Sequence, residues 1–215
     1  MTKKERDMSV FTYILGMYKT NCYLITDGHN AVIVDPADKA PYLLSKLEEK
    51  GLKLCRILLT HAHFDHIMAS NDLKAHTGAP IFAGLPDKEG LQDVEKSYLL
   101  QLGRKTDGIY ADGFFSHGDT FCELGKDISV LLTPGHTKGS VCYVIGRDIF
   151  CGDLVFKDGF GRCDLYGGNE GQMVQSLKML RDFFAENGTD YILRPGHGDK
   201  LTADYFMKQT DFLNR

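Results

Sequence analysis

The residues best suited to chemistry lie in one short segment, His61-Ala62-His63-Phe64-Asp65-His66. Imidazole nitrogens and carboxylate oxygens are ordinary ligands for zinc, and also for iron and manganese. Alternate side chains of an irregular loop can be aimed at one point, so His61 and His63 can face one metal ion while Asp65 and His66 face another. The apolar run from Cys55 to Leu59, typical of a buried strand, comes just before it. We therefore predict that this segment opens a metal site.

Three later residues have the same kind of placement, because each follows a predicted strand and is directly preceded by glycine. They are His136, Asp153 and His197. Glycine permits the tight turn that brings a side chain back over the edge of a sheet. With the first segment they supply five histidines and two aspartates, which is too many ligands for one tetrahedral metal ion. Two metal ions that share one bridging carboxylate fit this number.

The elements that must position these residues alternate between short β-branched runs and helical patterns. The predicted strands cover residues 10–15, 22–26, 31–34, 55–59, 81–83, 113–115, 128–132, 141–145, 149–151 and 191–193. The predicted helices cover residues 41–50, 67–76, 170–186 and 202–212, with one more inside 85–112. This order predicts an α/β sandwich of two sheets with outer helices. Nothing in the composition marks a boundary, so we expect one domain over 1–215, with residues 1–8 as a loose tail.

Composition and charge indicate which classes of binding partner the chain is suited to. The net charge of −4 provides no basic field for a phosphate backbone, so we expect no nucleic-acid partner. No apolar stretch reaches the 18 residues needed to span a bilayer, and no apolar segment follows the polar N-terminus, so we expect no membrane partner. The six cysteines form no C-x-x-C pair, which indicates free thiols in a reducing, cytoplasmic protein. The oligomeric state stays open.

Together these motifs resemble the metallo-β-lactamase superfamily over nearly the whole chain. The resemblance implies an α+β fold, a four-layer αββα sandwich with the metal ions at one edge. It also implies a distribution of ligands: His61, His63 and His136 for one metal ion, Asp65, His66 and His197 for the other, and Asp153 as the bridge between them.

Within that superfamily the chain resembles the glyoxalase II-like group, the hydroxyacylglutathione hydrolases. The supporting segments are residues 59–66, residues 133–140 and Gly159-Phe160-Gly161-Arg162-Cys163-Asp164. In that group the third segment carries a basic residue that reaches the substrate, which makes Arg162 a candidate substrate contact, with Lys157 and Tyr166 nearby. Longer members carry a further C-terminal helical domain that helps to hold glutathione. This chain resembles the short, single-domain bacterial members, so the thiol carrier stays open.

The expected reaction is thioester hydrolysis. Two metal ions about 3.5–4 Å apart can hold a hydroxide at neutral pH, and that hydroxide attacks a carbonyl while one metal ion stabilises the oxyanion. Asp65 can both bind metal and orient the nucleophile. The leaving thiolate, with a thiol pKa of about 8.5, needs little help from an acid. We expect two divalent ions, zinc first, with iron or manganese as alternatives, and a small thioester such as S-lactoylglutathione as substrate.

An oxidoreductase is the alternative. Persulfide dioxygenases are similar in this region, bind a single iron and share the pattern Gly161-Arg162-Cys163-Asp164. Retention of Asp65, His66 and His197 does not exclude them, because relatives can keep residues that no longer bind metal.

Overall fold

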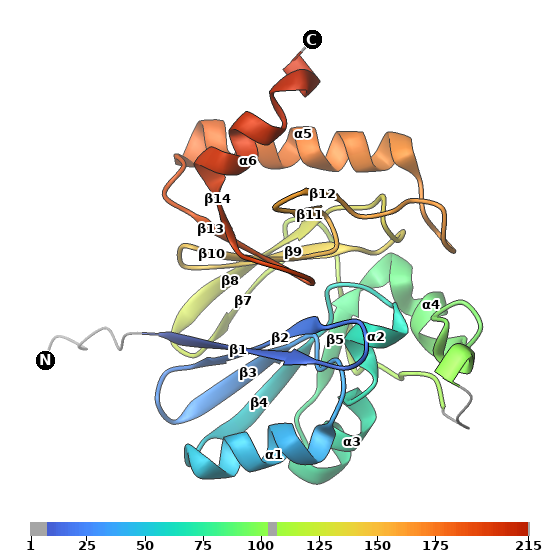
Figure 1. Ribbon diagram of the computed structural model, residues 1–215. Helices are drawn as coiled ribbons and strands as arrows, with labels where there is room; N and C mark the ends of the chain where they lie inside the picture. The colour runs from blue at the N-terminus through green and yellow to red at the C-terminus, as the bar shows by residue number, and fades with distance from the viewer. Residues whose placement is uncertain (1–7, 103–106, 215) are drawn as a thin grey trace, which may run out of the picture.

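Two facing sheets form the centre of the protein in the computed structural model, which describes residues 8–102 and 107–214 (Figure 1). The first sheet consists, in spatial order, of β1 (Ser9–Leu15), β2 (Thr20–Thr26), β3 (Asn30–Val34), β4 (Lys53–Leu58), β5 (Ile81–Gly84) and β6 (Gly113–Phe115). The second consists of β14 (Leu201–Thr202), β13 (Ile192–Pro195), β10 (Asp148–Gly152), β9 (Val141–Ile145), β8 (Lys126–Leu132) and β7 (Thr120–Glu123).

Helices cover the outer face of each sheet. α1 (Ala40–Glu49) and α3 (Ser70–Thr77) lie on the first sheet, and α5 (Glu170–Asn187) and α6 (Ala203–Gln209) lie on the second (Figure 1). Buried apolar side chains form three clusters, one under each helical layer and one between the sheets. This confirms the expected four-layer αββα sandwich.

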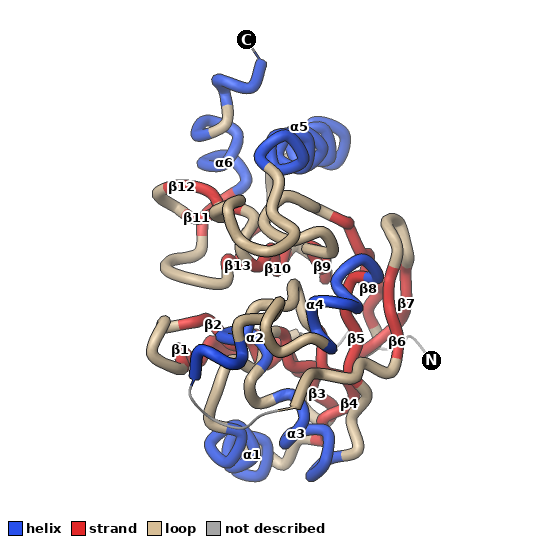
Figure 2. The backbone as a smooth tube through the Cα atoms, turned by 90° about the vertical axis from the view of Figure 1, so that its right-hand side faces the viewer, coloured by secondary structure: helices blue, strands red, loops and turns tan. Residues whose placement is uncertain are grey.

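Short elements fill the edge where the two sheets open. They are α2 (Phe64–Ile67), α4 (Lys88–Gln92), the hairpin of β11 (Val155–Phe156) and β12 (Gly159–Phe160), and 3-10 helices over Leu85–Asp87 and Leu99–Leu102. A further 3-10 helix, Asp211–Asn214, follows α6 near the C-terminus, away from this edge. Figure 2 shows α2 and α4 at this edge, between the layers of the sandwich. The loops that carry the candidate ligands come to the same edge.

Several local predictions differ from the structure. The helix expected over 67–76 is two helices, α2 and α3, because the chain turns after Ile67, where the amide of Ala69 bonds the carbonyl of Pro36. The strands β7, β11, β12 and β14 were not predicted. The helix expected over 202–212 ends at Gln209 and continues as a 3-10 helix. The tail predicted for residues 1–8 lies outside the described residues except for Met8, which packs against the core between the sheets.

All six cysteines are free thiols, as expected, although only Cys22, Cys142 and Cys151 are buried. Within the described residues, no helix combines the length and the apolar character needed to cross a membrane.

Candidate metal centre

The candidate ligands all follow the carboxyl ends of strands. His61 comes after β4, and His136, Asp153 and His197 come after β8, β10 and β13. β10 pairs in parallel with β13, and β8 and β10 are both antiparallel to β9, so these three strands run in the same direction. Their carboxyl ends therefore meet at one edge of the second sheet, where side chains far apart in the sequence converge.

Glycine precedes each of the three later ligands, and the structure gives two different reasons for it. Gly135 and Gly152 have φ angles of 142° and 49°, which side-chain-bearing residues rarely adopt. Gly196 is needed for space, because a Cβ at this position would collide with the Asp153 carboxylate and the His66 ring. The tight-turn prediction therefore holds for Gly135 and Gly152, whereas Gly196 is explained by close packing.

A first group of three imidazoles is wholly buried. His61, His63 and His136 are 1%, 5% and 3% exposed, and each offers one nitrogen that lies within 4.8 Å of the others. His63 Nδ1 is 2.8 Å from His136 Nε2. We call these residues the histidine group.

A second group combines a carboxylate with two imidazoles and reaches further toward solvent. Asp65, His66 and His197 also offer ligand atoms within 4.8 Å of one another. Asp65 Oδ2 lies 3.6 Å from His66 Nε2 and 3.3 Å from His197 Nε2, and the His197 side chain is 28% exposed. Thr20 Oγ1 donates to Asp65 Oδ2 at 2.9 Å and holds that carboxylate in place. We call these residues the mixed group.

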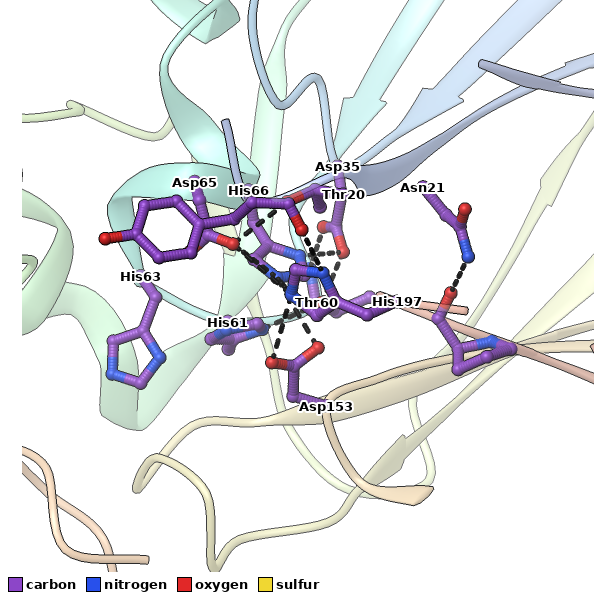
Figure 3. A network of polar contacts seen from close by, with 12 residues as sticks. Thr20, Asn21, Asp35, Thr60, His61, His63, Asp65, His66, Asp153 and His197 are labelled. Carbon is purple, nitrogen blue, oxygen red and sulfur yellow. Dashed lines mark hydrogen bonds and ion pairs between the residues drawn. The ribbon is translucent and has the colours of Figure 1, made fainter. Parts of the chain in front are cut away.

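Asp153 lies between the two groups. Its Oδ2 is 3.5 Å from His136 Nε2 of the histidine group. The same carboxylate is 3.4 Å from His66 Nε2 and 3.5 Å from His197 Nε2 of the mixed group. Figure 3 shows it pointing toward His66 and His197 from the opposite half of the molecule. The structure thus brings all seven predicted ligands together, and their role as ligands stays a prediction.

Hydrogen bonds behind the imidazoles fix which nitrogen faces the centre. His66 Nδ1 pairs with Asp35 Oδ2 at 2.9 Å, His136 Nδ1 with the Arg162 carbonyl at 2.7 Å, and His197 Nδ1 with the Tyr18 carbonyl at 3.1 Å. Metal-binding histidines typically carry such a partner on the other ring nitrogen, since it sets the tautomer and the ring orientation. The Nε2 atoms are therefore the ones presented to a metal ion.

Asp35 is a supporting residue that the sequence prediction missed. It is 1% exposed and follows β3, with an unusual φ of 51°. Its Oδ1 accepts from the Thr60 amide, and its Oδ2 accepts from the Thr60 hydroxyl in addition to facing His66. Asp35, His61 and His66 also offer atoms close enough to share a metal ion. Because these hydrogen bonds already use both Asp35 oxygens behind the rings, we assign it to orienting His66.

Asp87 supports the histidine group in a comparable way and was also missed. It is 4% exposed. One carboxylate oxygen accepts from the Ala62 amide and the Thr137 hydroxyl, and the other accepts from the Gly139 amide. Asp87 therefore ties the loop of His61 and His63 to the loop of His136.

The imidazoles of the two groups differ in charge, since His61 and His63 are neutral whereas His66 carries a proton. Burial and the neighbouring imidazoles push the pKa of His61 well below its usual value and lower that of His63 to about 3. Burial also opposes protonation of His66, but the carboxylates of Asp65, Asp153 and Asp35 outweigh it and raise the pKa of His66 to about 10. Asp65 in turn has a pKa far below its usual value, since its cationic imidazole neighbours outweigh burial.

The three predicted substrate contacts lie in different surroundings. Tyr166 lines a pocket together with His63. Arg162 is exposed, and its guanidinium forms a two-pronged pair with Asp164 at 2.7 Å for both bonds. Lys157 pairs with Asp199 at 3.4 Å. Their contact with a substrate stays a prediction.

Unsatisfied polar atoms show that the site fits metal ions. His61 Nε2, His63 Nε2 and Asp153 Oδ1 are buried without a hydrogen-bond partner. Leaving buried polar atoms unpaired is costly, so the unpaired atoms of His61 and Asp153, which belong to the ligand cluster, indicate a missing partner. Nitrogen and carboxylate donors in this arrangement suit a divalent ion of the first transition series or zinc.

Comparison with known proteins agrees with this geometry. The chain is 31% identical over 202 residues to the hydroxyacylglutathione hydrolase GloC of Haemophilus influenzae, covering 92% of this chain and 94% of that one. Among solved structures, the B3 metallo-β-lactamase BLEG-1 has a TM-score of 0.86 at 31% identity, covering 96% of this chain and all of that one. TTHA1623, in a di-iron-bound form, has a TM-score of 0.81 at 30% identity, with coverage of 94% and 98%.

A match to a family sequence profile identifies the family of the chain. The profile of the Metallo-beta-lactamase superfamily matches residues 15–193, which span β2 to β13 and six of the seven predicted ligands. Together with the αββα layers and the ligand cluster at their edge, this match shows that the chain belongs to the metallo-β-lactamase superfamily.

Proposed function

We propose that this protein is a binuclear metal-dependent hydrolase that cleaves a small thioester of the kind represented by S-lactoylglutathione. The observation that carries the proposal is the position of Asp153, whose carboxylate lies within 3.5 Å of imidazoles from both ligand groups. Similarity to GloC over nearly the full length of both chains supports the thioester class.

The histidine group would hold one metal ion and the mixed group the other, with Asp153 shared between them. When bound, two such ions supply a Lewis acid for the substrate carbonyl and a water of lowered pKa. Zinc is our first choice, and the di-iron form of TTHA1623 keeps iron as a candidate.

The chain's own residues prepare this chemistry. Thr20 fixes the Asp65 carboxylate, which can then accept a proton or a hydrogen bond from water in one orientation. Asp35 fixes His66 from behind. A thiolate leaves without a strong acid, because an ordinary thiol has a pKa of about 8.5. Hydrolysis of a thioester therefore asks of the protein mainly the orientation of water and carbonyl.

An activity panel on metal-loaded protein tests the proposal. We expect two metal ions per chain by elemental analysis and turnover of S-lactoylglutathione. Asp65→Asn should lower that turnover by on the order of a hundredfold or more. Asp72→Asn, the same change at an exposed position of α3, is the matched control and should leave turnover unchanged.

The same panel includes two competing reactions. A single iron per chain with oxygen uptake on glutathione persulfide would replace our proposal with the dioxygenase alternative. The similarity to BLEG-1 makes a β-lactam the second competing substrate. Turnover of the β-lactam without turnover of the thioester would contradict the proposed substrate class.

A further inference from the structure

A pocket opens beside the histidine group. It is open to solvent, and His63 lines it together with Lys96, Lys138 and Tyr166. A group bound here would lie next to the proposed reaction centre.

Two lysines flank the ring of Tyr166. The Nζ atoms of Lys138 and Lys96 lie 5.2 Å and 5.3 Å from its centroid, within the range of cation–π attraction. Lys96 is already neutralised, because it pairs with Glu89 and lies 3.3 Å from Asp93. The Tyr166 hydroxyl donates to Glu89 at 2.7 Å and closes that network.

Lys138 differs from Lys96 in its charge balance. Among residues 8–102 and 107–214, no carboxylate lies within ion-pair distance of its ammonium. The carboxylate of Asp87, which also lines the pocket, is already bonded by Ala62, Thr137 and Gly139. Lys138 therefore contributes a positive charge at the rim of the pocket that forms no direct ion pair within the described residues, with Glu89 as a longer-range electrostatic neighbour.

The pocket is preformed by its neighbours. Tyr98 has a φ of 64°, which is unusual for a residue with a side chain. It packs its ring 5.7 Å from that of His63, while its hydroxyl accepts the Tyr166 amide at 3.0 Å. Gly167 has a φ of 80°, and a Cβ there would lie 3.2 Å from Lys138 Cγ. Tyr98 thus joins the pocket to the histidine group, and Gly167 leaves room for the lysine stem.

We propose that this pocket is a specificity subsite for a carboxylate-bearing arm of the substrate, with Lys138 as the counter-ion and the Tyr166 ring as the platform. The inference rests on the proposed thioester hydrolysis and adds the charge class of the substrate. One unpaired cation matches the single charge of a carboxylate better than the roughly two charges of a phosphate monoester.

Matched thioesters test the subsite. Lactoyl thioesters of N-acetylcysteine and N-acetylcysteamine differ only by a carboxylate on the thiol arm. Succinyl and butyryl thioesters of N-acetylcysteamine place the carboxylate on the acyl arm. We expect Lys138→Met to raise KM about tenfold for the carboxylate member of one pair, as expected for loss of a charged contact, and to leave its neutral partner within about twofold. The pair that responds identifies the arm.

Lys178→Met is the matched control, since Lys178 is exposed on α5 and remote from the pocket, and it should change neither KM. Equal KM changes for both members of each pair, or no change in either pair, would overturn the subsite.

Binding separates this inference from the proposed function. The thioethers that correspond to the two ester pairs lack the scissile carbonyl, and their Kd can be measured by calorimetry whether or not any ester turns over. We expect the carboxylate thioether to bind about tenfold more tightly than the neutral one, with that preference lost in Lys138→Met and weakened by salt. If no thioester turns over but this preference holds, the proposed function fails and the subsite stands. Without the preference, the subsite fails whether or not thioesters turn over.

Discussion

The histidine group and the mixed group lie side by side, yet burial and charge differ between them. The histidine group is almost closed to solvent and has imidazole pKa values pushed below their usual range. In the mixed group the His66 pKa rises to about 10, and His197 is partly exposed. The difference arises because carboxylates surround His66, whereas the rings around His61 and His63 are mainly other imidazoles.

Each group also has its own buried carboxylate behind it. Asp35 touches an imidazole of the mixed group directly, while Asp87 bonds main-chain and hydroxyl groups of the two loops that carry the histidine group. Asp35 therefore orients the His66 ring, whereas Asp87 holds two loops together. The two groups should therefore respond differently to substitution and to pH, although they share Asp153.

Loss of the shared carboxylate should have the largest effect. We predict that Asp153→Ala loses both metal ions and with them the hydrolytic activity, because its carboxylate contacts both groups. Elemental analysis after desalting measures the metal content. Asp182→Ala, an exposed aspartate on α5, is the control. Full metal retention in Asp153→Ala would contradict the bridging role.

Loss of one ligand from each group should separate the two sites. His61→Ala and His197→Ala should each retain about one metal ion per chain, since each leaves the other group intact. The metal-free proteins should differ as well. His61 is buried, so its removal should lower the free energy of unfolding by about 2 kcal/mol or more, whereas removal of the partly exposed His197 should cost less.

Urea unfolding of the metal-free variants and elemental analysis of the loaded ones provide both measurements. Loss of both metal ions in both variants would show that the groups bind metal as one unit, which would contradict two separable sites.

Neutralising the supporting carboxylates should have a smaller and more selective effect. Asp35→Asn keeps the shape and tolerates the positive φ, but removes the charge behind His66. We expect metal affinity of the mixed group to fall about 10- to 100-fold, with the histidine group unchanged. Asp87→Asn should instead weaken the histidine group. Stepwise metal titration resolves the two affinities, and the same site weakening in both variants would contradict separate supports.

The layers, and the convergence of the seven candidate ligands at one edge, could be predicted from the sequence because both depend on local patterns. Apolar runs marked most strands, and a glycine before a polar residue marked the turns at their ends. Strands of two residues, such as β11 and β14, are too short to show an alternation. The interruption between α2 and α3 could not be predicted, because the helical spacing of apolar residues continues through it.

The supporting residues were harder to find because their roles depend on distant partners. Asp35 did have a local signal, since it comes directly after a buried strand, as Asp153 does. Asp87 and Lys138 had none. Asp87 bonds residues about 50 positions away, and the charge of Lys138 has meaning only where the loop of Tyr166 folds against it.

The pH dependence of metal binding should be the mildest contrast between the groups. The His66 pKa of about 10 lies above its ordinary 6.5, so in the metal-free chain its proton stabilises the fold fully below about pH 6.5, and that stability is lost as pH rises through 10. A metal ion at the mixed group must displace this proton, so its affinity should rise up to about tenfold per pH unit between about pH 6.5 and 8.

The histidine group should bind without this dependence, because the low pKa values of His61 and His63 leave both rings neutral over that range. Calorimetric titration in two buffers of different ionisation enthalpy counts the protons released at each step. We expect at least one proton for the mixed group in excess of the histidine group, because Asp65 and Asp153 outweigh burial and raise the pKa of His197 as well. Equal proton release at both steps would mean that the carboxylates around His66 do not keep it protonated, and the charge contrast between the groups would fail.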